Sequence, residues 1–138
     1  TTRLSTRLIE GEFPNYRQLI PASHPNALTV ERDTLLEAIR RMKILAKDAT
    51  PVRLAISSDA LRLTAITQDV GNASEELDAT TSGSDLTVAF NPDYLASGVE
   101  ALSTEQITLS TIDGLKPAVV RGVGSDEYLY LLMPVRVP

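Results

Sequence analysis

Cysteine and tryptophan are absent from this chain of 138 residues, and histidine occurs once, as His24. Without cysteine the chain has no disulfide scaffold, no thiolate nucleophile and no zinc site built from Cys or Cys/His ligands. A single histidine also excludes most histidine-based metal chemistry. We therefore expect no metal and no cofactor, and the lack of cysteine agrees with a reducing compartment.

Long apolar runs and an excess of positive charge are missing too. No stretch approaches the 18 or more apolar residues of a membrane span, and residues 1–13 lack the apolar core of a signal peptide, so we expect a cytoplasmic protein. Thirteen Lys and Arg against eighteen Asp and Glu give a formal charge of -5. This balance argues against coating nucleic acid by bulk charge, and any such contact must come from a local stripe.

What is present suits one globular domain. With 43% apolar and 22% charged residues, a chain of this length can bury about two thirds of its unfolded surface. Residues 3–9 read as a strand that opens the chain, so we expect the sequence to be part of a longer polypeptide.

The order of predicted elements repeats within the chain. Each half reads as a strand, a helix and three strands, from the alternating and helical periods of its apolar residues. The predicted elements are 27–32, 33–48, 52–57, 60–68 and 73–80 in the first half, and 85–91, 92–102, 106–111, 117–122 and 127–135 in the second.

Capping and turn residues support these boundaries. Asp33 stands at the start of the first helix, and Asn91 with Pro92 at the start of the second. Asp59 and Asp113 mark hairpin turns at matching places. We predict an α+β fold of two pseudo-symmetric strand-helix-three-strand units, over about 27–80 and 85–135, with both helices on one face of antiparallel sheets.

The first predicted helix carries an apolar stripe and a basic stripe. At about 100° per residue the core face comprises Leu35, Ala38, Ile39, Met42, Leu45 and Ala46. Arg40, Lys43 and Lys47 fall on the opposite face, where they are either an ordinary solvated surface or a phosphate-binding one. Leu36 and Ile44 project toward the charged side, as scattered exposed residues or as a partner surface.

Three stretches, FPNYRQLIP (13–21), VAFNPDYL (88–95) and MPVRV (133–137), resemble the bacterial sliding clamp family, the beta subunit of DNA polymerase III. Together with the repeated unit, they are similar to its third, C-terminal domain. The resemblance implies the DNA-clamp fold for residues 13–138, and it implies that residues 1–12 are the end of the preceding middle domain or its connector.

That family implies a non-catalytic function and several partners. Two subunits form a head-to-tail homodimer, a ring around duplex DNA that keeps the polymerase processive. The DNA polymerase III catalytic subunit, the clamp loader, other polymerases and mismatch-repair proteins would each bind the ring through a short peptide motif. By resemblance, Arg40, Lys43 and Lys47 face DNA, and Ile44, Glu76 and Asp78 lie at the contact between subunits.

The resemblance also implies an apolar peptide-binding pocket. Its residues on this chain would be Pro14, Gln18, Leu19, Asn91, Tyr94, Leu115, Pro117, Leu131, Met133, Pro134, Val135 and Arg136. Proline, leucine and the adaptable Met133 suit an apolar socket, while Asn91 and Arg136 can hydrogen-bond a peptide at its rim. Without the family, Leu131 and Met133 read as strand core and Arg136 as a solvated residue.

Two other functions stay open on the residues alone. One is a peptide-binding interaction module with no role on DNA. The other is a small hydrolase, with candidates Ser82, Ser84, Asp85 and Asp113, although turn chemistry accounts for those positions. His24 reads as a solvated loop residue, and we expect no catalytic residue.

Overall fold

The computed structural model describes residues 1–46, 50–68 and 70–137. Its helices are the short 3-10 helix η1 (Tyr16–Gln18), α1 (Arg32–Leu45) and α2 (Pro92–Glu100). Its strands are β1 (Asn26–Glu31), β2 (Val52–Ser57), β3 (Ala60–Thr67), β4 (Gly71–Asp78), β5 (Thr80–Ser82), β6 (Leu86–Phe90), β7 (Gln106–Thr111), β8 (Ala118–Gly122) and β9 (Leu129–Leu132). Both halves have the predicted order of a strand, a helix and three strands.

The strands form two antiparallel sheets that share strands between the halves. One sheet has the order β4-β3-β2-β6 and the other β5-β1-β7-β8-β9. The first strand of each half therefore pairs in the sheet of the other half. Leu28 of β1 lies opposite Leu109 of β7, and Val88 of β6 lies opposite Leu54 of β2. Each half completes the sheet of the other, so the two halves form one structural unit.

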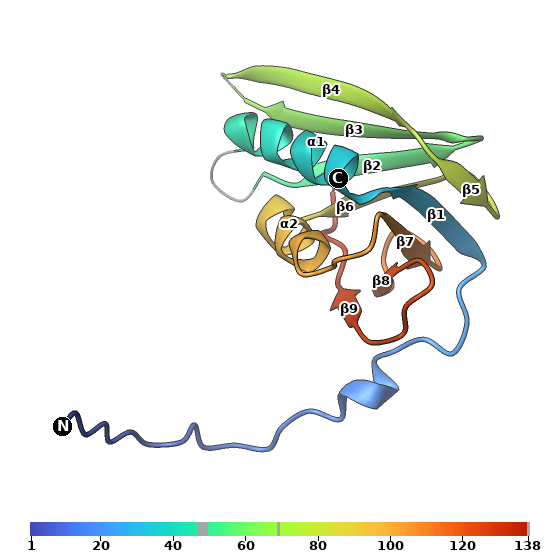
Figure 1. The fold of residues 1–138 in the computed structure, drawn as a ribbon. Helices are drawn as coiled ribbons and strands as arrows, with labels where there is room; N and C mark the ends of the chain where they lie inside the picture. Colours follow the sequence, from blue (N-terminus) through green and yellow to red (C-terminus); the bar gives the residue numbers. More distant parts are fainter. Residues whose placement is uncertain (47–49, 69, 138) are drawn as a thin grey trace.

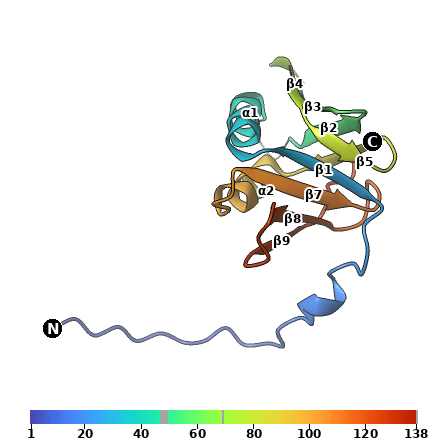
Figure 2. The ribbon, with the colours of Figure 1, turned by 45° about the vertical axis from the view of Figure 1, so that its right-hand side comes forward.

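Both helices lie on the same side of the two sheets, as predicted (Figures 1 and 2). α1 contacts β3, β4, β1 and α2, and α2 also contacts β9. The core between helices and sheets contains fully buried Phe90, Leu35, Ile39, Leu54 and Leu95. Burial of such side chains contributes about 1.5–3 kcal/mol each, which fixes the helix pair against the sheets.

The start of α2 follows the sequence prediction, and the start of α1 does not. The Asn91 side-chain oxygen accepts hydrogen bonds from the backbone N–H of Asp93 (2.8 Å) and Tyr94 (3.3 Å), and Pro92 occupies the first turn. In α1 the N-cap is Glu31, and Asp33 lies within the first turn. The prediction of an Asp33 cap was therefore wrong.

Three further predictions need correction. Residues 3–9 form no strand in the described range 1–46, because an extended segment without a neighbouring strand has no partner for its backbone groups. β5 begins at the last residue of the predicted strand 73–80 and continues into residues 81–82, where no strand was predicted, and it pairs with β1. The last strand ends at Leu132, and Pro134, which lacks an N–H, follows it.

The buried face of α1 is wider than predicted. Leu36, expected on the charged side, is 5% exposed, while Ile44 is 71% exposed. Because α1 contacts both the sheet strands and α2, its buried arc extends beyond a single stripe. Neither described helix, α1 or α2, is long and apolar enough to cross a bilayer.

Candidate functional site

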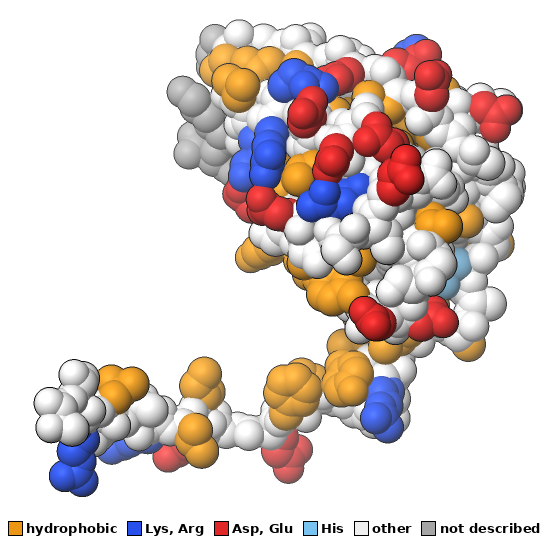
Figure 3. Space-filling view, viewed as in Figure 1, with side chains coloured by type: hydrophobic (Ala, Val, Ile, Leu, Met, Phe, Trp, Pro, Cys, Tyr) orange, Lys and Arg blue, Asp and Glu red, His pale blue; other side chains and the backbone are white. Residues whose placement is uncertain are grey.

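The basic stripe of α1 is paired with acidic residues of α2. Arg40 Nη2 lies 2.7 Å from Glu100 Oε1, and Lys43 Nζ lies 2.6 Å from Asp93 Oδ1. These two pairs run in opposite directions along the helices, so α1 and α2 are antiparallel. Figure 3 shows basic and acidic side chains side by side on this face. Lys47, the third residue of the predicted stripe, lies outside the described residues.

The sequence analysis did not single out Asp93 and Glu100. They are seven positions apart, about two helical turns, and so share one face of α2. Exposed ion pairs contribute roughly 0–1 kcal/mol. The cations of α1 therefore stay available to an incoming phosphate, since a second anion can compete with such weakly held partners.

The C-terminal half of α1 is also tied to β4, the last strand of its sheet. Arg41 donates two hydrogen bonds to Glu75, at 3.0 and 2.5 Å. These hydrogen bonds hold the pKa of Glu75 below its ordinary value, and they raise the pKa of Arg41. Glu75, which the sequence analysis did not single out, thus turns toward α1.

The three residues predicted at a subunit contact do not lie on one face. Because side chains alternate along a strand, Glu76 and Asp78 point away from α1, opposite to Glu75. Glu76 accepts a hydrogen bond from Arg62 of β3 at 2.7 Å. Ile44 is exposed on α1. All three nevertheless belong to elements that border the open edge of β4.

Several of the predicted peptide residues lie on segments that contact β6 or begin α2. The backbone N–H of Val135 donates to the Ala89 carbonyl at 2.7 Å, so the C-terminal segment runs beside β6. The turn between β7 and β8 also reaches β6, because a Cβ at Gly114 would lie 3.0 Å from the Thr87 carbonyl oxygen. Val135 therefore lies beside a residue two positions before Asn91, the cap of α2, and the turn at Gly114 meets β6 four positions before it.

The surface formed there exposes large apolar side chains. Tyr94, Leu115 and Met133 are 61%, 61% and 58% exposed. Leu131 is half-buried, and its neighbour Leu132 is buried in the core. The interpretation of Met133 as strand core was therefore wrong. Exposed apolar residues of this size on adjoining segments are typical of an interaction site.

Pro14, Gln18 and Leu19 belong to a separate segment. They are exposed, and η1 is ordered by local contacts, such as the Leu19 N–H bond to the Tyr16 carbonyl and the edge-to-face contact of Phe13 with Tyr16. Figures 1 and 2 show the chain before β1 running away from the body of the domain. The structure therefore does not bring these three residues to the surface around Asn91.

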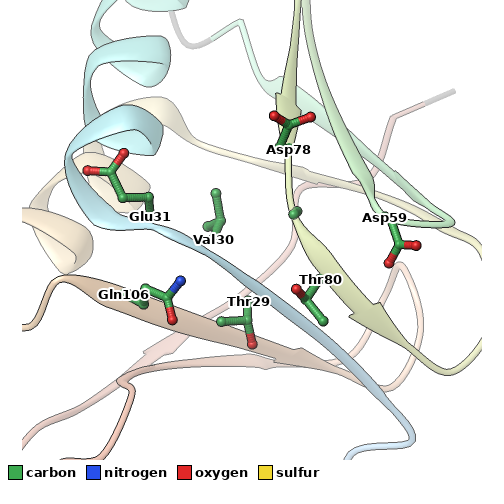
Figure 4. A pocket seen from close by; sticks show the side chains of 8 residues that line it. Thr29, Val30, Glu31, Asp59, Asp78, Thr80 and Gln106 are labelled. Carbon is green, nitrogen blue, oxygen red and sulfur yellow. The ribbon is translucent and has the colours of Figure 1, made fainter.

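Two cavities lie elsewhere in the fold. One, of about 460 Å³, is lined by side chains from β1, β4 and β5, among them Thr29, Asp78 and Thr80 (Figure 4). The other, of about 450 Å³, lies beside Arg121 and the loop after β8. Neither is lined by a predicted peptide residue. A third, of about 300 Å³, is lined by residues 9–14, among them the predicted peptide residue Pro14.

Asp113, one of the candidates for hydrolysis, has a structural role. The Asp113 carboxylate accepts hydrogen bonds from the backbone N–H of Leu115 (2.8 Å) and Lys116 (2.9 Å), which lower its pKa and close the turn. His24 is half-buried rather than solvated, and burial, followed by the charge of Arg121, lowers its pKa. Among the residues described, no three His, Asp or Glu side chains are grouped to bind a metal.

Comparison with known proteins covers nearly the whole chain. Among curated relatives, the "Beta sliding clamp" of Streptomyces coelicolor is 37% identical over 98% of this chain and 38% of its own length. That of Synechococcus elongatus is 35% identical over 97% of this chain and 36% of its own length. This chain therefore spans less than two fifths of the length of these relatives.

Solved structures give the same result. The beta subunit of DNA polymerase III from Thermotoga maritima matches 96% of this chain and 36% of its own, with a TM-score of 0.91 and 29% identity. The sliding clamp of Bartonella birtlesii bound to griselimycin matches 94% of this chain and 35% of its own, with a TM-score of 0.89 and 33% identity. Residues 17–136 match the family model for the "DNA polymerase III beta subunit, C-terminal domain", and the chain belongs to that family.

Proposed function

We propose that this chain acts as the C-terminal domain of a cytoplasmic, non-catalytic sliding clamp. In a head-to-tail homodimeric ring it forms part of the wall around duplex DNA and keeps the replicative polymerase attached. The observation that carries this proposal is the antiparallel helix pair that presents Arg40 and Lys43 outward. It belongs to a domain that follows a solved beta subunit along 96% of the chain.

The charges of the helix pair suit a sliding contact. Phosphate attraction is independent of sequence and weakens with salt. Arg40 and Lys43, with Lys47 as the third predicted cation, supply that attraction. Glu100 and Asp93 moderate it by pairing with the same cations. A ring holds DNA by enclosure, so weak and nonspecific attraction is enough, and tight binding would slow its movement.

The combined variant Arg40→Gln/Lys43→Gln tests the contact with DNA in the complete clamp. Each lost phosphate contact reduces the magnitude of the negative slope of log K against log salt by about 1. We therefore expect a flatter salt dependence and less processive synthesis. The matched variant Asp93→Asn/Glu100→Gln frees both cations and should steepen the slope. An unchanged slope and processivity in the first variant would favour a peptide-binding module without a role on DNA.

We also propose that the surface around Asn91 binds short peptides of partner proteins. Tyr94, Leu115 and Met133 supply exposed apolar area, and Asn91 and Arg136 supply hydrogen-bonding groups at the rim. Pro117, Leu131, Pro134 and Val135 complete this surface in the proposal. The partners are the DNA polymerase III catalytic subunit, the clamp loader, other polymerases and mismatch-repair proteins.

Replacing Leu131 and Met133 together by Ala should weaken binding of a clamp-motif peptide by about 2 kcal/mol, roughly 30-fold, because anchors that become buried on binding dominate affinity. Calorimetry or fluorescence anisotropy measures the change. Val123→Ala is the control, since Val123 is exposed beside the other cavity. Equal affinities for the double variant and the control would remove this surface from the peptide site.

The edge of β4 is proposed as the contact with the other subunit. β4 is the last strand of its sheet, so its outer backbone groups are open to a strand from another chain. Exposed Ile44 adds apolar area beside this edge, and Glu76 and Asp78 add charges that complement basic residues.

Ile44→Arg in the complete clamp should dissociate the ring, because it places an unpaired charge in a desolvated contact. Analytical ultracentrifugation reports the change from dimer to monomer. Val123→Arg introduces the same charge away from β4 and should leave the dimer intact. A dimer of unaltered stability in the Ile44 variant would place the contact elsewhere.

A further inference from the structure

A glycine in the middle of α2 makes room for an aromatic ring. A Cβ built at Gly98 would lie 2.8 Å from Cγ of Tyr130 and closer still to the edge of the ring. Glycine weakens a helix interior relative to alanine. Its presence at position 98 is explained by this close approach, in which the Tyr130 ring lies directly against the helix backbone.

Tyr130 lies just before the segment that carries much of the proposed peptide surface. It is the second residue of β9, where it lies opposite Val120 of β8. The ladder with β8 ends at Leu132, and the next backbone contact is the bond from Val135 to Ala89. Met133 lies between these two points, so the position of β9 determines where its exposed side chain is presented.

The same ring also adjoins other tyrosines. The rings of Tyr128 and Tyr130 are stacked, with centroids 6.4 Å apart. Burial raises the pKa of Tyr130, and the nearby hydroxyls of Tyr128 and Tyr94 raise it further. Tyr94 lies one helical turn before Gly98 on α2. Tyr130 thus connects α2, close to Tyr94, with the strand that leads to Met133.

We propose that Tyr130, seated on Gly98, is a positioning residue that fixes the segment 133–136 relative to α2 and so sets the shape of the peptide surface. Its significance for peptide binding rests on the function proposed above. The positioning itself does not depend on that function, because it concerns where Met133 lies in the free chain.

The two methionines of the chain allow a direct test. Methyl-labelled methionine gives two NMR signals, one from Met42, buried in α1, and one from Met133, exposed after β9. In Gly98→Ala the added methyl group displaces Tyr130. We expect the Met133 methyl signal to shift and the Met42 signal to stay in place. Ser97→Ala, at the exposed neighbouring position, should leave both signals unchanged.

The direction of the change in melting temperature is an independent test of the contact between Gly98 and Tyr130. An unhindered Gly→Ala change in a helix raises the melting temperature, whereas overpacking against Tyr130 lowers it. We expect Gly98→Ala to have a lower melting temperature than wild type. We expect the double variant Gly98→Ala/Tyr130→Ala to have a higher melting temperature than Tyr130→Ala alone. If Gly98→Ala does not fold, Tyr130→Leu should still shift the Met133 signal, because it removes the ring without adding volume.

Peptide titration separates this inference from the proposed function. If wild-type chain binds a clamp-motif peptide, Gly98→Ala should bind it at least about threefold more weakly, as expected for coupled neighbouring groups. An unshifted Met133 signal in both Gly98→Ala and Tyr130→Leu, or a raised melting temperature for Gly98→Ala alone, would overturn the positioning role. If the Met133 methyl signal of the wild-type chain does not change when the peptide is added, the proposed peptide site would be overturned instead.

Discussion

The exchange of first strands between the two halves is the constraint on which the other features depend. β1 pairs along β7, and β6 pairs along β2, so each sheet is completed by a strand from the opposite half. Because β1 leads directly into α1 and β6 leads directly into α2, this exchange also places the two helices next to one another. The ion pairs of Arg40 and Lys43 with α2 follow from that placement.

The two edge strands of the sheet β4-β3-β2-β6 have different neighbours. β6 is one end of the sheet β4-β3-β2-β6, and the C-terminal segment runs beside it through the bond from Val135 to Ala89. β4, at the other end, is flanked by α1 through the Arg41 and Glu75 pair. One end of the sheet therefore carries the proposed peptide surface, and the other the proposed subunit contact.

Much of the fold could be predicted from the sequence because its signals are local. The periods of apolar residues identify the helices and most strands, and Asn91 with Pro92 marks the start of α2. The errors arose where contacts between distant segments determine the burial of a residue or the formation of a strand. Leu36 is buried because α1 is covered on more than one side, and β5 forms because β1 has a free edge.

The candidate sites were predicted less completely for the same reason. The family resemblance supplied the basic residues of α1 and the peptide residues near Asn91. The pairing of Asp93 and Glu100 with those cations depends on how two helices are placed, which no single segment specifies. The role of Gly98 depends likewise on Tyr130, 32 positions further along the chain by their numbers, and a glycine alone gives no signal of the ring that lies against it.

Native-state hydrogen exchange tests the central claim most directly. The claim is that the two halves form one cooperative unit, because β1 and β6 each pair in the sheet of the opposite half. The amides of Leu28 and Val30 in β1 and of Val88 and Phe90 in β6 are the reporters. The account predicts that the most protected amides of both strands open with the same free energy and the same dependence on denaturant, as in global unfolding. Two distinct opening energies, with one sheet exchanging while the other stays protected, would contradict it.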